Sequence, residues 1–148
     1  MILGISGSGI QDGNLERMVK RVLELTRQKT RFIRLAELTI RPCTGCVGCA
    51  TSNRCVAQDD GNRLLEAIQE AKAVVWGTAC YFGRPNAFVA TAMERMYPLR
   101  HREMLTSGKA AAALVIGGGI GLDETAKQME SMLSGYMHLA YQGHVTWA

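Results

Sequence analysis

The chain has 148 residues, a formal net charge of +4, 16 glycines and five cysteines. This length accommodates a single domain, 1–148, and the fractions of charged (20%) and hydrophobic (47%) residues exclude intrinsic disorder, a coiled coil and collagen. The uncharged and strongly apolar run Ala110 to Leu122 is shorter than the ~20 residues of a membrane span, so no membrane span is expected. Because the first residues lack the basic region of a signal peptide, we expect a cytoplasmic protein, where clustered cysteines favour metal or redox chemistry over disulfides.

Short apolar runs alternate with helical spacing along the first half of the chain. Met1–Ile5 predicts a strand, and the apolar residues of 15–23 recur at three- and four-residue intervals, which predicts a helix. Phe32–Leu35 predicts an edge strand, because arginines flank and interrupt it. Residues 40–58 show no period and predict a loop, after which Asp60 is the expected N-cap of a second helix.

The second half continues the alternation. Ala73–Thr78 predicts a buried strand, and Pro85 suits the first turn of a third helix. Ala110–Gly117 predicts another buried strand, and residues 122–136 a fourth helix. The expected apolar face of the third helix consists of Phe88, Val89, Ala92, Met93 and Met96. A closing strand is expected to contain Leu139, Tyr141, Val145 and Trp147.

This order of elements predicts the α/β class. Strands that are apolar throughout and alternate with helices indicate a doubly wound, five-stranded parallel sheet with helices on both faces. Right-handed crossovers place the carboxyl ends of all strands at one edge, where ligands of open α/β sheets bind. The loops 6–14, 40–58, 78–84 and 117–121 share that edge.

Three of these loops are candidates for binding a cofactor. The glycine-rich loop 6–14 precedes a helix and can cradle a phosphate, although an ordinary turn between strand and helix has the same composition. Tyr81 and Phe82 can pack against a flat ring or cap the core. Residues 117–121 offer bare backbone N–H groups to a ligand, or form only a flexible turn.

The fourth loop contains Cys43, Cys46, Cys49 and Cys55, a C-x2-C-x2-C-x5-C pattern. Thiolates at three-residue intervals favour a [4Fe–4S] cluster, as in bacterial ferredoxins. Zinc sites separate their cysteine pairs by a longer stretch, but zinc and free or redox-active thiols remain alternatives. Cys80 lies outside the spacing and is expected to be a buried structural thiol.

Charge and histidine placement suggest little further. Seven of the 17 basic residues fall between Arg17 and Arg34, which favours the polar face of the first helix and leaves an acidic redox partner as a second reading. No aromatic residues alternate with these charges as a nucleic-acid platform would require, so no nucleic-acid partner is expected. The three histidines show no metal-ligand spacing.

Taken together, these motifs resemble the iron–sulfur flavoproteins, a branch of the NAD(P)H-dependent FMN reductase-like family with the flavodoxin-like fold. The resemblance covers nearly the whole chain: residues 2–8, the four-cysteine loop, Asp59-Asp60, Tyr81-Phe-Gly83 and Gly117-Gly-Gly119. It implies that the FMN phosphate is bound by Ser6, Ser8 and Asn14. It also implies that the isoalloxazine ring is lined by Thr78, Ala79, Tyr81, Phe82 and Gly83, with Gly117, Gly118 and Gly119 on its other side. The implied ligands of a [4Fe–4S] cluster are Cys43, Cys46, Cys49 and Cys55.

The chain departs from the family pattern in two places. In the first loop, Gly9 and Ile10 replace the usual Pro and Arg, and Leu15 replaces a hydroxyl residue, which is expected to weaken phosphate binding. The family also carries a helix after the fifth strand, for which no segment is evident before Ala148. We therefore expect an apolar sheet face that is covered by another subunit, in a homo-oligomer or a hetero-complex, or by a chain from which this one has been cut.

The resemblance implies an electron-transfer flavoprotein that passes electrons between a ferredoxin-like partner, the cluster and FMN. No side chain is an evident acid–base catalyst, which agrees with cofactors that carry the chemistry. Two alternatives remain. One is a cluster-free NAD(P)H-dependent FMN or quinone reductase, and the other is a metal-cluster docking subunit of a larger redox complex that has lost FMN.

Overall fold

A computed structural model describes residues 1–141 and contains one sheet. Five parallel strands lie in the order β2-β1-β3-β5-β6, and the short β4 pairs antiparallel with β3. This order and the parallel pairing confirm the predicted doubly wound sheet, with β2 at one edge as expected. The strands are β1 (Ile2–Ser6), β2 (Thr30–Arg34), β3 (Ala73–Tyr81), β4 (Arg84–Pro85), β5 (Ala110–Ile116) and β6 (His138–Tyr141).

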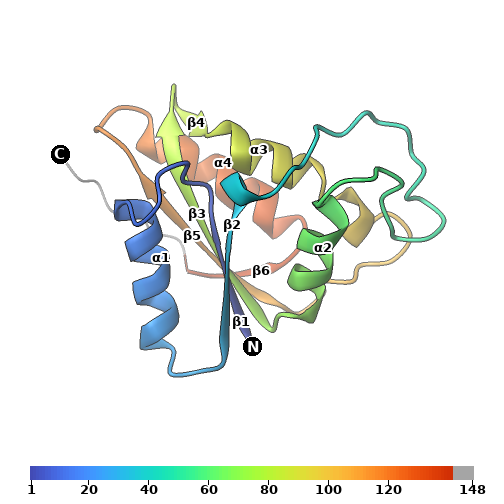
Figure 1. Ribbon diagram of the computed structural model, residues 1–148, viewed down its shortest axis with the longest axis horizontal. Coiled ribbons are helices and arrows are strands. Elements are labelled where there is room, and N and C mark those ends of the chain that lie inside the picture. The colour runs from blue at the N-terminus through green and yellow to red at the C-terminus, as the bar shows by residue number, and fades with distance from the viewer. Residues whose placement is uncertain (142–148) are drawn as a thin grey trace.

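Helices cover both faces of the sheet (Figure 1). Helix α1 packs on one face, and α2, α3 and α4 pack on the other (Figure 1). Among the residues described, no helix is long and apolar enough to cross a membrane. The helices are α1 (Asn14–Leu25), α2 (Gly61–Glu70), α3 (Ala87–Glu94) and α4 (Leu122–Ser134), with short 3-10 helices at Leu35–Glu37 and Tyr97–Leu99.

The core is unequal on the two faces. The larger cluster, centred on the fully buried Trp76, fills the space between the sheet and α2, α3 and α4. Under α1, the hydrophobic cluster is small: its buried members are Val19, Leu23 and Val75, Leu15 is buried one turn earlier in the helix, and Leu114 of β5 stays partly exposed. Within the described residues, α1 alone covers that face, as expected from the sequence, and its covering by another subunit remains a prediction.

One predicted helix start is wrong, and a second is confirmed in position but lacks the expected capping bond. Pro85 lies in β4, because the chain reverses at Phe82 (φ 54°) and Gly83 (φ 70°) and pairs back along β3. Asn86 caps α3 instead, accepting a hydrogen bond from the N–H of Val89. Asp60 stands at the N-cap position of α2, but its carboxylate accepts a hydrogen bond from the N–H of Thr39 and does not cap the helix.

Other differences concern the extent of elements. Strand β3 continues to Tyr81, three residues beyond the prediction, and α3 ends before Met96. Phe88 is 44% exposed and does not belong to the core. The closing strand is confirmed for His138–Tyr141, whereas the predicted Val145 and Trp147 lie outside the described residues.

Candidate functional site

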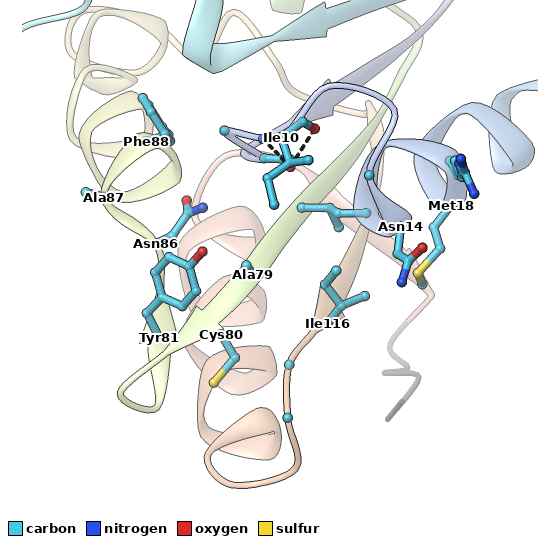
Figure 2. Close-up of a pocket in the computed structure, with 17 residues that line it drawn as sticks. Ile10, Asn14, Met18, Ala79, Cys80, Tyr81, Asn86, Ala87, Phe88 and Ile116 are labelled. Carbon is cyan, nitrogen blue, oxygen red and sulfur yellow. Dashed lines mark hydrogen bonds between the residues drawn. The ribbon is translucent and has the colours of Figure 1, made fainter. Parts of the chain in front are cut away.

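A cavity of about 840 Å³ opens at the carboxyl edge of the sheet. It lies between the loop before α1 and the start of α3, above the ends of β3 and β5 (Figure 2). Such a volume, with mostly apolar walls and a few polar groups, is typical of a cofactor site. The lining residues are Ser8, Gly9, Ile10, Gly13, Asn14, Leu15, Arg17, Met18, Ala79, Cys80, Tyr81, Asn86, Ala87, Phe88, Ile116, Gly117 and Gly118.

The cavity brings together part of the residue set that the resemblance implied. Lining residues from that set are Ser8, Asn14, Ala79, Tyr81, Gly117 and Gly118. Outside the lining are Ser6, Thr78, Phe82, Gly83 and Gly119. The structure therefore places the implied phosphate and ring residues in two groups, one at the cavity wall and one beside it.

Two of the residues outside the lining support those within it. Ser6 is fully buried, and its hydroxyl accepts a hydrogen bond from the N–H of Ser8 at 3.2 Å. Thr78 is also fully buried, and its hydroxyl accepts a hydrogen bond from the N–H of Asn86 at 3.2 Å. By contrast, Phe82 is 99% exposed at the tip of the β3–β4 turn.

A buried carboxylate holds the loop before α1 in place. Glu16 is fully buried and accepts a hydrogen bond from the N–H of Asp12 at 3.1 Å. Lys20 and Arg34 form ion pairs with it at 2.6 and 3.1 Å. Burial by itself raises the pKa of Glu16, but the hydrogen bonds from these two cations lower it overall. The ionised Glu16 thereby fixes Asp12, a non-glycine residue with a positive φ of 53°.

Asn86 joins the two sides of the cavity. Its side-chain N–H donates a hydrogen bond to the carbonyl of Gly7 at 2.6 Å, and its side-chain oxygen caps α3. Gly7 tolerates no side chain there, because a Cβ would lie 2.3 Å from a methyl carbon of Val89. Asn86 and Gly7 thus set the distance between the loop before α1 and helix α3.

Cys80 differs from its predicted role. It is only partly buried, and it lines the cavity next to Tyr81 (Figure 2). Its thiol donates a hydrogen bond to the carbonyl of Gly121 at 3.3 Å and accepts one from the Thr125 hydroxyl at 3.1 Å. The prediction of a buried structural thiol is therefore wrong in its burial: Cys80 packs against the edge of the core, but β3 continues there into the cavity wall and leaves the thiol partly exposed.

The four clustered cysteines lie apart from this cavity. Residues 40–58 contribute nothing to the described lining, and in Figure 1 the loop projects beside α2, on the opposite side of the sheet from α1. Burial raises the pKa of the Cys49 thiol, and the charges of Cys55, Cys43 and Cys46 raise it further. Among the described residues, however, no three metal-ligating side chains surround a common point.

The surroundings of Cys46 favour its thiolate. Hydrogen bonds from the backbone of Gly48 and from the Thr44 side chain lower the pKa of Cys46. The guanidinium of Arg95 lies 3.2 Å from Sγ of Cys55, and Nδ1 of His101 lies 3.1 Å from Sγ of Cys49. Four thiols in one loop form a donor set whose chemistry fits an iron–sulfur cluster or another thiophilic metal.

The segment after α3 holds the cysteine loop against the domain. The Asn53 side chain donates a hydrogen bond to the carbonyl of Glu103 at 2.8 Å and accepts one from its N–H at 3.3 Å. Arg102 donates a hydrogen bond to the carbonyl of Thr51 at 3.1 Å. Together with the contact between His101 and Cys49, these bonds attach the middle of the loop to residues 101–103.

The buried carboxylate of Asp59 is expected to make the free energy of unfolding depend on pH. Its carboxylate is 2% exposed, and the hydrogen bonds from Arg95 hold its pKa well below the ordinary value of about 3.9. A carboxyl group whose pKa is lower in the folded than in the unfolded protein stabilises the fold above its unfolded-state pKa. This stabilisation decreases as pH falls from the unfolded-state pKa toward the folded-state pKa. In metal-free protein, we expect the gap in unfolding free energy between wild type and Asp59→Asn to narrow by about 1 kcal/mol from pH 6 to pH 3. Urea denaturation at both pH values measures it, and a constant gap would contradict the assigned pKa direction.

Sequence reasoning missed several residues that the site uses. Asn86 follows Pro85 and precedes an apolar run, so the N-cap preference for Asn was the available signal. Arg17 lines the cavity from the first turn of α1, a place that helical periodicity indicates. No local pattern marks Arg95 or His101, because their contacts with the cysteines join segments about 40 to 52 residues apart.

Comparison with known proteins places these features in a family. The model of the NADPH-dependent FMN reductase family matches residues 1–148. An iron-sulfur flavoprotein of Methanocaldococcus jannaschii is 32% identical over 130 residues, covering 86% of this chain and 67% of that protein. One from Archaeoglobus fulgidus is 30% identical over 138 residues, covering 90% and 62%. The chain thus spans roughly two thirds of the length of these relatives.

Solved structures agree on the fold. An NADH:FMN oxidoreductase in its apo form superposes with a TM-score of 0.71 at 16% identity, covering 98% of this chain and 74% of the other. A flavone reductase gives a TM-score of 0.77 at 20% identity, covering 99% and 54%. These likenesses show the flavodoxin-like fold, while the sequence matches show the family. The chain belongs to the NADPH-dependent FMN reductase family, in its branch of iron–sulfur flavoproteins.

Proposed function

We propose that the chain is an electron-transfer flavoprotein that binds FMN in the cavity and a [4Fe–4S] cluster on the cysteine loop. The observation that carries the proposal is the presence, in one domain, of a cofactor-sized cavity and a separate loop that contains four closely spaced cysteines. When bound, the flavin exchanges one or two electrons and the cluster exchanges one at a time. A ferredoxin-like partner would then supply or accept the single electrons.

The cavity fits FMN by its distribution of groups. Ser8, Asn14 and the N-terminus of α1 offer hydrogen-bond donors and a positive dipole end to a phosphate. At the other end, Tyr81 and Ile116 lie on opposite sides of the cavity in Figure 2, with room for a flat ring between them. Gly117 and Gly118 leave their backbone N–H groups open to ring heteroatoms.

Arg17 is expected to compensate for the arginine that the first loop lacks. It is the only charged residue among the described lining residues, and it lies in the first turn of α1. We expect Arg17→Gln to weaken FMN binding about fivefold, since an exposed, charge-assisted hydrogen bond contributes roughly 1 kcal/mol. Fluorescence titration of FMN measures the affinity.

Arg21→Gln is the matched control for this prediction. Arg21 stands one helical turn further along α1, pairs with Glu24 at 3.2 Å and is absent from the cavity lining. Its replacement is expected to leave FMN affinity unchanged. Equal weakening by both variants would indicate a general effect of surface charge and would remove Arg17 from the site.

The cysteine loop would hold the cluster through Cys43, Cys46, Cys49 and Cys55. Its position beside α2, outside the cavity, means that the pocket residues and the thiols can bind their groups independently. Electron passage across an interface with a second subunit is one route between them.

A cluster-free flavin reductase is the second candidate. It is favoured by the observation that, within the described residues, the thiols do not yet surround a common point. Anaerobic purification followed by iron, zinc and flavin analysis distinguishes the candidates. The proposal expects one FMN and about four iron atoms per chain. Flavin without iron would select the reductase, and metal without flavin would select a docking subunit that has lost FMN.

A further inference from the structure

The two ends of the cysteine loop meet at one buried side chain, Arg95. This residue follows the last turn of α3, and its side chain is 2% exposed. Its Nη1 donates a hydrogen bond to the carbonyl of Arg41, two residues before Cys43, at 2.7 Å. Both of its Nη atoms bind the carboxylate of Asp59, four residues after Cys55, at 2.7 and 2.9 Å.

The pair of Arg95 and Asp59 is fully enclosed. The Asp59 side chain is also 2% exposed, and it accepts further hydrogen bonds from the N–H groups of Arg41 and Gly61. A Cβ on Gly61 would lie 2.5 Å from Nη2 of Arg95, so the start of α2 fits closely around the guanidinium. A buried ion pair adds little stability compared with apolar residues of the same size. We therefore infer that this pair serves to hold the two ends of the cysteine loop in one conformation.

The same guanidinium touches a candidate cluster ligand. Nη2 of Arg95 lies 3.2 Å from Sγ of Cys55. The backbone of Cys55 is held in turn by Asn62 of α2, whose side chain accepts a hydrogen bond from its N–H at 3.1 Å and donates one to its carbonyl at 2.8 Å. Cys55 is therefore fixed from two helices, with a permanent positive charge against its sulfur.

We propose that Arg95, oriented by Asp59, is a positioning residue that closes the cysteine loop and donates a charge-assisted hydrogen bond to the Cys55 thiolate, which raises the reduction potential of the cluster. This inference rests on the proposed function for the cluster, but the closure of the loop does not. Reduction adds one negative charge to a cluster, and hydrogen bonds and positive charge near its sulfurs stabilise that reduced form.

The first test uses metal-free protein and examines closure alone. Arg95→Met leaves the Asp59 charge buried, so the double variant Arg95→Met/Asp59→Asn removes both charges together. Both variants are expected to be cleaved in 42–58 several-fold faster than wild type by elastase, which cuts after small apolar residues and therefore does not depend on Arg54. Arg54→Met is the matched control, because Arg54 lies in the loop and pairs with exposed Glu66 without a described contact to a cysteine. Cleavage of the double variant at the wild-type rate would overturn the closing role.

The second test measures the midpoint potential of the reconstituted cluster. Arg95→Lys keeps the charge but loses the forked geometry, so its potential is expected to shift negative, and the double variant to shift further. Arg54→Met is expected to keep the wild-type potential. An unchanged potential in the iron-loaded double variant would refute the hydrogen bond to Cys55. If wild-type protein takes up no iron, the proposed cluster and its effect on the reduction potential are both refuted. The proteolysis experiment then still tests whether Arg95 closes the cysteine loop.

Discussion

Replacing Cys49 by alanine is expected to reduce the iron content from about four atoms per chain to near zero, and to remove the broad visible absorption of the cluster. A cubane cluster needs a thiolate at each iron, and no spare cysteine lies in the loop. Cys49 is the third of the four cysteines. Its carbonyl accepts a hydrogen bond from the N–H of Asn53 at 3.0 Å, which holds its backbone in a tight turn. Iron and acid-labile sulfide analysis after anaerobic reconstitution measures the loss.

The fifth cysteine supplies the matched control for this experiment. Cys80 lies in the cavity wall, and Cys80→Ala is expected to retain full iron content. The flavin content of Cys49→Ala should also remain at the wild-type level, because Cys49 is absent from the cavity lining. Full iron retention by Cys49→Ala, or equal iron loss in both variants, would contradict the assigned ligand set.

Asn86→Ala is expected to lower the free energy of unfolding by about 2–4 kcal/mol and to weaken FMN binding. The substitution removes the cap of α3 and leaves the buried carbonyl of Gly7 without its described side-chain donor. Loss of this bridge frees the loop before α1 from α3, and the cavity lies between these two elements. Urea denaturation measures the stability, and FMN titration measures the affinity.

Asn86→Asp separates the two roles of this side chain. A carboxylate keeps the acceptor for the N–H of Val89 but offers no donor to Gly7. We expect it to recover the capping part of the stability while FMN binding stays weak. If Asn86→Ala binds FMN as tightly as wild type, the bridge does not shape the cavity.

Much of the fold follows from patterns within single segments. The uniformly apolar stretch around Trp76 predicts a strand that is buried on both faces. Because helices connect such strands, the sheet is predicted to be parallel, as it is in the structure. The β4 hairpin could not be predicted in this way. A positive φ at Phe82 is rare for an aromatic residue, so the reversal that puts Pro85 into a strand has no compositional signal except Gly83.

For the candidate site, too, local patterns predict some residues, whereas others come together only through tertiary packing. Ser8, Asn14 and Gly117 lie in loops whose position at the carboxyl edge follows from topology, and all three line the cavity. The spacing of the cysteines is likewise visible in the sequence. Their partners are not visible there, because Arg95, directly after α3, reaches Cys55 only in the folded chain, and an arginine is usually a surface residue.

The proposed function requires that electrons pass between the cluster and the flavin. Rapid mixing measures the rate of this transfer. Oxidised protein containing both cofactors would be mixed anaerobically with a reduced low-potential ferredoxin, while the absorption of cluster and flavin is followed separately. Wild-type flavin is expected to be reduced rapidly, and flavin in Cys49→Ala, which lacks the cluster, far more slowly. Reduction of the flavin at the same rate in both proteins would show that electrons do not pass through the cluster.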